Sequence, residues 1–253
     1  MLLSRRQILL AAPLATLACT RKETPPPPPK PAWPRTTTHA GVEMIELFPR
    51  DADERSPLVV LVHGLGDRPQ HWVEGLKAFP AQAHLVLPRA FTPHGGGFSW
   101  FRFEDGMTDE QFGAAVGEAE AKLWPALLEV AAGRRMVVTG FSQGGILSYA
   151  MASRHPDVVL RAVPVSGACP GPLLPKNKSK AAPVVALHGT TDTVLEIKWD
   201  RETIAAFKAE GNDAELKEYE GVGHTITPEM RADWHDALVT GVRTMKEAPV
   251  TPK

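Results

Sequence analysis

The stretch MVVTGFSQGGILSYAMASRH, Met136 to His155, decides the fold. It begins with a short β-branched run that is typical of a strand and ends with a helical pattern of apolar residues. Between the two stands Ser142, flanked by Gly140 and Gly144 in the pattern G-x-S-x-G. A tight strand-to-helix turn holds a serine hydroxyl clear at the tip of the strand. The stretch therefore predicts that Ser142 is a nucleophile; the alternative is that it only forms a turn.

Short strand-like runs recur along the chain on both sides of this stretch. They lie at Val42–Phe48, Leu58–Val62, His84–Leu87, Met136–Thr139, Ala162–Val165, Val184–Leu187 and Glu215–Tyr219. Helical patterns lie between them, at Gln70–Ala78, Asp109–Ala131 (with Asp109 as N-cap), Ile146–Ser153, Arg201–Glu210 and Pro228–Lys246. This alternation predicts right-handed crossovers and an α/β fold with a doubly wound, mostly parallel sheet.

Composition places the chain among ordinary globular proteins and excludes several classes. Hydrophobic residues make up 43% of the 253 residues and the formal net charge is −1. No basic stripe is present, so we expect no nucleic-acid partner. The only cysteines are Cys19 and Cys169, which predict no disulfide framework. We interpret Cys169 as a buried or loop thiol.

The N-terminal region predicts an address and a tether. Residues 1–18 combine a basic start, Arg5-Arg6, with an apolar run too short to span a bilayer, as in a signal peptide. SRRQILL resembles a bacterial twin-arginine export signal. ATLAC resembles a lipoprotein cleavage site, although Thr16 stands where such sites usually carry leucine; this predicts lipidation of Cys19. Plain export with cleavage near Ala18 and an uncleaved anchor remain alternatives.

The proline-rich segment that follows favours a stand-off from a membrane. Residues 19–35 include five consecutive prolines, Pro25–Pro29, which form neither helix nor sheet. We expect a lipid-anchor cysteine and tether over residues 19–35 and the folded domain over residues 36–248. The predicted location is the bacterial cell envelope, in the periplasm or at the outer membrane, or secretion if Cys19 carries no lipid. Membrane contact is expected only through Cys19.

Four polar or glycine-rich loops follow predicted strands and should meet at one edge of the sheet. They are HGLGD (63–67), GFSQGG (140–145), HGTTD (188–192) and GVGH (221–224). A serine nucleophile needs a base and a group that orients it, in the order Ser, acid, His for this fold. Asp192 and His224 fit that order. His63 and His188 are more typical of loop histidines that hydrogen-bond the backbone, and His155 precedes the acid.

An oxyanion formed during acyl transfer needs two backbone N–H donors. The residue after the nucleophile, Gln143, supplies one. The loop HGLGD supplies the other, for which Leu65 is the candidate and Gly64 and Gly66 are alternatives.

Together the four loops resemble those of the phospholipase/carboxylesterase family, which includes acyl-protein thioesterases and has the α/β-hydrolase fold. The resemblance implies a triad of Ser142, Asp192 and His224, with the N–H groups of Leu65 and Gln143 as oxyanion hole. It also implies hydrolysis of esters or thioesters without a cofactor or metal. Where family members often carry Trp, an aromatic residue and Asp, this chain has Trp100, Phe101 and Arg102; the acid loop also departs, at Leu195.

We expect Trp100, Phe101 and Leu195 to line the substrate pocket. Few residues separate Ser142 from Asp192, too few for a cap domain, so the chain should have an open site for small esters of short to medium acyl chain. A related enzyme class, a polysaccharide acyl esterase or a peptidase, is the first alternative. An inactive hydrolase fold that serves as a binding lipoprotein is the second.

Overall fold

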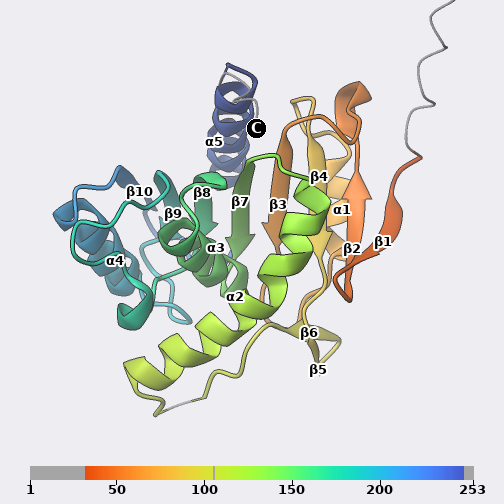
Figure 1. The fold of residues 1–253 in the computed structure, drawn as a ribbon. Helices are drawn as coiled ribbons and strands as arrows, with labels where there is room; N and C mark the ends of the chain where they lie inside the picture. Colours follow the sequence, from red (N-terminus) through yellow and green to blue (C-terminus); the bar gives the residue numbers. More distant parts are fainter. Residues whose placement is uncertain (1–31, 105, 248–253) are drawn as a thin grey trace, which may run out of the picture.

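The computed structural model describes residues 32–104 and 106–247. The predicted signal peptide, Cys19 and residues 19–31 of the tether lie outside this range. The main strands are β1 Arg35–His39, β2 Val42–Leu47, β3 Leu58–Val62, β4 His84–Pro88, β7 Met136–Phe141, β8 Val159–Val165, β9 Val184–Gly189 and β10 Ala214–Tyr219. Within the described residues they form one eight-stranded sheet in the order β1-β2-β4-β3-β7-β8-β9-β10. Helices cover both faces (Figure 1).

Within the described sheet the strands from β4 to β10 pair in parallel, and β2 runs antiparallel to both of its neighbours, β1 and β4. All seven predicted strands are present; one matches at both ends, and each of the other six differs at one end by one to three residues. The strand β1 was not predicted, because its sequence RTTTH contains no apolar residue to mark a buried face. The hairpin of β5 Thr92–His94 and β6 Gly97–Ser99 was also not predicted.

Five α-helices pack on the sheet: α1 Gln70–Leu76, α2 Asp109–Ala131, α3 Gln143–Arg154, α4 Ile197–Ala209 and α5 Pro228–Glu247. The prediction that Asp109 caps α2 is wrong. The cap is Thr108, whose hydroxyl accepts from the Gln111 N–H while the Gln111 side chain accepts from the Thr108 N–H. This reciprocal pair satisfies two donors, whereas Asp109 lies inside the first turn. None of the helices in the described part of the chain is both long and apolar enough to span a bilayer.

Alternation along the central strand β3 divides the interior into two cores. Leu58, Val60 and Val62 pack in the core that α2, α3 and α4 cover. Val59 and Leu61 pack in the opposite core, with residues of α1 and α5. All five side chains are buried, as expected of a parallel strand covered on both faces.

The strand order places a topological switch beside β3. The chain leaves β3 for β4 on one side and later returns to β7 on the other. Crossovers on the two sides diverge, and sites in such sheets form at the carboxyl ends of the strands at this point, here β3 and β7. The loops HGLGD and GFSQGG follow these two strands.

A buried ionic cluster at the opposite edge of the sheet ties β1 and β2 to β4. Glu46 accepts hydrogen bonds from Arg35 at 2.8 Å, Thr37 at 2.6 Å and His84 Nε2 at 2.7 Å. Burial alone would raise the pKa of Glu46, but these hydrogen bonds outweigh burial and hold the pKa far below its usual range. A carboxyl with a depressed pKa stabilises the fold above its unfolded-state pKa, and this stabilisation is lost as the pH falls.

Candidate active site

Ser142 occupies a strained turn between β7 and α3. Its backbone has φ 56° and ψ −118°, a conformation that non-glycine residues rarely adopt. Gly140 and Gly144 cannot carry a side chain, because backbone atoms lie too close to both. A Cβ on Gly144 would lie 1.9 Å from the Val62 carbonyl oxygen, and one on Gly140 would lie 2.5 Å from the Gly144 backbone. The elbow predicted from the sequence is therefore present.

Asp192 holds the imidazole of His224. The Nδ1 of His224 lies 2.7 Å from Asp192 Oδ2, and the N–H groups of Val194 and Leu195 donate to Oδ1 at 2.9 Å each. Burial alone would raise the pKa of Asp192, but the hydrogen bonds from His224 and these N–H groups outweigh it and lower the pKa. The ionised acid accepts a hydrogen bond from Nδ1–H, which leaves Nε2 of His224 as the basic nitrogen.

The imidazole lies against the nucleophile elbow. The ring of Phe141, the residue before Ser142, is 4.7 Å from the ring of His224 between centroids. The Ser142 hydroxyl makes no hydrogen bond to any described residue. The structure thus brings Ser142, Asp192 and His224 to the same edge of the sheet, with the His224 ring against the residue that precedes Ser142.

Hydrogen bonds within the loop HGLGD fix the direction of the Leu65 N–H. His63 Nδ1 donates to the Gly64 carbonyl at 2.7 Å, and the Asp67 N–H donates to the same carbonyl at 3.4 Å. Because a trans peptide directs its C=O and N–H oppositely, the Leu65 N–H points to the other side. Gly66 donates its N–H to the Phe98 carbonyl at 2.9 Å, which removes that alternative. The N–H groups of Leu65 and Gln143 donate to no described residue.

Gln143 has a second role that the sequence did not indicate. Its side-chain oxygen accepts from the Trp100 N–H at 3.0 Å, and its amide nitrogen donates to the Phe101 carbonyl at 2.9 Å. The Trp100 indole in turn donates to the His63 carbonyl at 2.8 Å. The expectation that Trp100 and Phe101 line a pocket is not met: they are 3% and 6% exposed and lie outside the lining of the main cavity. Instead, these two buried residues link the loop of His63 to Gln143, because the indole N–H and the backbone groups of this segment take their hydrogen-bond partners there.

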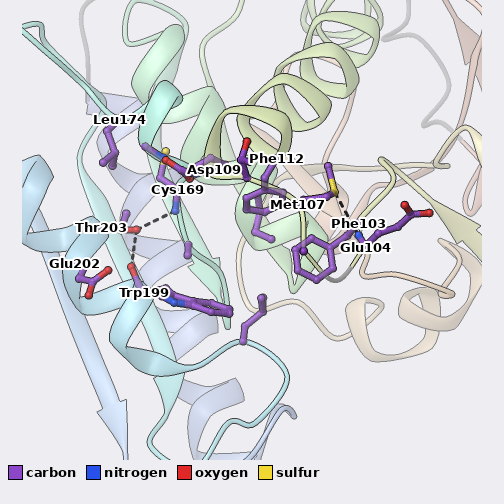
Figure 2. A pocket seen from close by; sticks show the side chains of 17 residues that line it. Phe103, Glu104, Met107, Asp109, Phe112, Cys169, Leu174, Trp199, Glu202 and Thr203 are labelled. Atoms are coloured by element: carbon purple, nitrogen blue, oxygen red, sulfur yellow. Dashed lines mark hydrogen bonds between the residues drawn. The ribbon is translucent and has the colours of Figure 1, made fainter.

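A cavity of about 520 Å³ lies next to the triad and contains neither Ser142 nor His224 in its wall. Two wall residues connect it to the triad: Ile146 N–H donates to the Ser142 carbonyl at 3.0 Å, and Leu195 N–H donates to Asp192. Leu195 was expected here. Figure 2 shows Phe103, from the loop before α2, and Trp199, from α4, reaching into the cavity from different elements. Its size falls within the range of small-ligand pockets, roughly 300–1,000 Å³.

Two other kinds of site can be compared with the serine site: a metal centre and a cysteine nucleophile. The described residues contain no group of three or more His, Cys, Asp or Glu side chains that could hold a metal. Cys169 lines the cavity, yet it is buried, and burial raises the pKa of its thiol well above the usual value. A thiol in this state is a poor nucleophile.

Comparison with known proteins identifies the family. The sequence profile of the phospholipase/carboxylesterase family matches residues 48–240. The chain belongs to this family. It is 25% identical over 199 residues to acyl-protein thioesterase 1 homolog 1 of Dictyostelium discoideum, across 71% of this chain and 88% of that protein. It is 30% identical over 202 residues to a probable inactive carboxylesterase of Oryza sativa, across 68% and 79%.

Solved structures agree on the fold. The crystal structure of esterase PE8 superimposes with a TM-score of 0.64 at 24% identity, and the match covers 80% of this chain and 96% of that chain. The protein therefore has the α/β-hydrolase fold, as the resemblance implied. The segment between β8 and β9 contains only the short 3-10 helix η2, Gly171–Leu173, and so carries no cap domain.

The close contact at the elbow gives a direct prediction. We expect Gly144→Ala to lower the free energy of unfolding by ~3 kcal/mol, because its Cβ meets the Val62 carbonyl and the core cannot relax around backbone. Urea denaturation measures the change. Gly117→Ala, in the middle of α2, is the matched control, since its Cβ would meet only side-chain atoms at 3.4 Å or more. Equal stability of the two variants would contradict the prediction.

Proposed function

We propose that the protein is a serine hydrolase that cleaves carboxylic esters, and thioesters of similar shape, through an acyl-enzyme on Ser142. Membership of the phospholipase/carboxylesterase family supports ester or thioester hydrolysis. The observation that carries the proposal is the arrangement of His224, bonded through Nδ1 to Asp192 and seated against Phe141 at the elbow. A histidine held by an acid in this way can act as the base for a serine hydroxyl at the elbow, which supports the proposal.

The proposed reaction uses only groups of this chain and water. Nε2 of His224 accepts the Ser142 proton as Oγ attacks the acyl carbonyl, and Asp192 stabilises the imidazolium. The oxyanion receives hydrogen bonds from the N–H groups of Leu65 and Gln143. Collapse expels the alcohol or thiol, which takes the proton from His224. Water then attacks the acyl-enzyme, with His224 as base, and releases the carboxylic acid and free Ser142.

The cavity beside the triad is proposed to hold the acyl group. Its wall is apolar in large part, with Phe103, Phe112, Ile146, Leu195 and Trp199. The charged residues among its described lining are Glu104, Asp109 and Glu202, all acidic, and none is Lys or Arg. An anionic acyl group would lose its hydration there without gaining a counter-ion. We propose that neutral or cationic acyl groups of short to medium length are the substrates.

Exposed apolar side chains near the site agree with this class of substrate. Leu65, Phe103, Val194 and Trp199 are among the few large hydrophobic residues of the described chain with exposed side chains. Leu65 lies in the loop HGLGD and Val194 lies beside Asp192. Phe103 and Trp199 line the cavity. Apolar surface around a site favours contact with an apolar part of a ligand.

The role of Ser142 is tested by Ser142→Ala. We expect turnover of p-nitrophenyl butyrate to fall by ~10⁴- to 10⁶-fold without loss of the fold, because the alanine cannot form the acyl-enzyme. Ser166→Ala is the control, since Ser166 directly follows the adjacent strand β8 and its buried hydroxyl has no partner among the described residues. A Ser142→Ala protein with near-native turnover would refute the proposal. If the native protein is folded but inactive, that result would instead favour an inactive hydrolase fold, as the name of the Oryza sativa relative describes.

The acyl preference is tested with a series of p-nitrophenyl esters from acetate to palmitate and with the anionic hemisuccinate. We expect kcat/KM to be highest between acetate and octanoate and to fall for palmitate, which exceeds the cavity. The hemisuccinate should react ~10-fold more slowly than butyrate, an effect of about 1.4 kcal/mol from the acidic wall. Glu202→Gln should reduce this difference. Palmitate as the best substrate, or equal rates for hemisuccinate and butyrate, would contradict the assignment.

We also propose that the protein is exported and attached to the bacterial cell envelope through a lipid on Cys19. The support is the sequence of residues 1–18 and the proline-rich segment that follows. Mass spectrometry of the mature N-terminus should find a lipid-modified Cys19 as the first residue, and Cys19→Ala should release the protein from membranes. An unmodified N-terminus beyond Cys19 would exclude the lipid anchor.

A further inference from the structure

A second histidine–carboxylate pair is buried directly behind Asp192. His188 is the penultimate residue of β9 and Asp200 lies on α4, and both are completely buried. His188 Nδ1 lies 2.8 Å from Asp200 Oδ2. The other oxygen of Asp200 accepts a hydrogen bond from the hydroxyl of Tyr149, a buried residue of α3. Three elements of the core therefore fix the orientation of one imidazole.

The far side of His188 touches the acid of the triad. Its Nε2 donates to the Leu195 carbonyl at 2.8 Å and lies 3.4 Å from Asp192 Oδ2. Leu195 is the residue whose N–H donates to Asp192 Oδ1. His188 thus holds the Leu195 backbone, which in turn holds Asp192. It also faces Asp192 Oδ2, the oxygen that accepts the hydrogen bond from His224.

The hydrogen bonds of His188 accommodate a positively charged imidazole. A carbonyl can only accept, so Nε2 carries a proton, and a second proton lies between Nδ1 and Asp200 Oδ2. Burial raises the pKa of Asp200, against the hydrogen bonds from His188 and Tyr149 that lower it. Burial alone would lower the pKa of His188, but the hydrogen bond to Asp200 and its charge outweigh burial and raise the pKa. The other charged or titratable groups facing the pair are Tyr149 from α3, Glu218 from β10, Cys169 from the loop after β8, and Asp192 itself.

We infer that His188, kept charged by Asp200, is a positioning residue that fixes Asp192 in the acid loop and limits how strongly Asp192 holds a proton on His224. The inference rests on the proposed serine-hydrolase function. A positive charge 3.4 Å from Asp192 Oδ2 offsets part of the negative charge that stabilises protonated His224. Its removal should therefore make His224 titrate at higher pH, and the base would become active only at higher pH.

Asp200→Asn isolates the charge from the hydrogen bonds. The amide oxygen can accept from Tyr149, and the amide nitrogen can donate to Nδ1 of a neutral His188, whose Nε2–H still reaches Leu195. All three hydrogen bonds are retained while the positive charge beside Asp192 is lost. We expect the midpoint of the His224 imidazole titration, followed by ¹⁵N NMR, to rise by ~0.5–1 pH unit. The acid limb of kcat/KM against pH should move by the same amount.

Glu46→Gln is the matched control. It removes a buried carboxylate from another buried histidine, His84, at the opposite edge of the sheet. It should lower stability without moving the His224 titration. A merely structural role for Asp200 would likewise lower activity at every pH and leave the midpoint unchanged, and that result would overturn the inference. A downward shift would overturn it as well.

Two further measurements keep the test decisive. If Asp200→Asn does not fold, His188→Asn removes the same charge and should raise the His224 midpoint in the same direction; no rise would refute the inference. The NMR titration needs no substrate, so it is independent of the proposed function. The native protein could hydrolyse no ester while Asp200→Asn still raises the His224 midpoint. That combination would contradict the hydrolase proposal and support the coupling of His188 to His224.

Discussion

The backbone contact between Gly144 at the start of α3 and the Val62 carbonyl at the end of β3 is the constraint on which the site depends. No side chain fits between the two segments, since even a Cβ would overlap the carbonyl oxygen. The contact brings the loop after β3 against the elbow after β7. Consequently the amides of Leu65 and Gln143, neither of which donates to a described residue, come from neighbouring loops on one edge of the sheet. Strain at Ser142 is tolerated because the core on both sides of the turn is packed.

Side-chain hydrogen bonds then make these loops rigid. Gln143 holds the segment of Trp100 and Phe101, and the Trp100 indole holds the His63 carbonyl. His63 in turn fixes the Gly64 carbonyl, which sets the direction of the Leu65 N–H. A donor that must meet a developing charge gains from such fixation, because it does not reorganise during the reaction. The buried aromatic residues thus contribute to the site by supporting its loops rather than by touching substrate.

The sequence was informative wherever one local pattern determines the structure. Leu58–Val62 is apolar at every position and forms β3 at the predicted bounds, and G-x-S-x-G placed the elbow. Prediction failed where tertiary contacts decide. The polar strand β1 is held by Glu46 and by pairing with β2, which its own sequence does not encode. An aromatic residue such as Trp100 is typical of a pocket wall. Its burial depends on the contact with Gln143, which is far away in the sequence. His188 was interpreted as a loop histidine, and nothing local to it indicates Asp200 or Tyr149 as partners.

Helix α3 connects the nucleophile to the acid through the protein core. Ser142 stands at its N-terminus, and Tyr149 lies two turns further on, hydrogen-bonded to Asp200. Asp200 holds His188, and His188 holds the loop that carries Asp192. The acid loop extends beyond the sheet, with Val194 exposed, so its own contacts with solvent would not fix it. Because the same helix sets both ends of this chain of contacts, a shift of α3 would move the serine and its acid together. The relative positions of Ser142 and Asp192 therefore follow from core packing, and not from the acid loop alone.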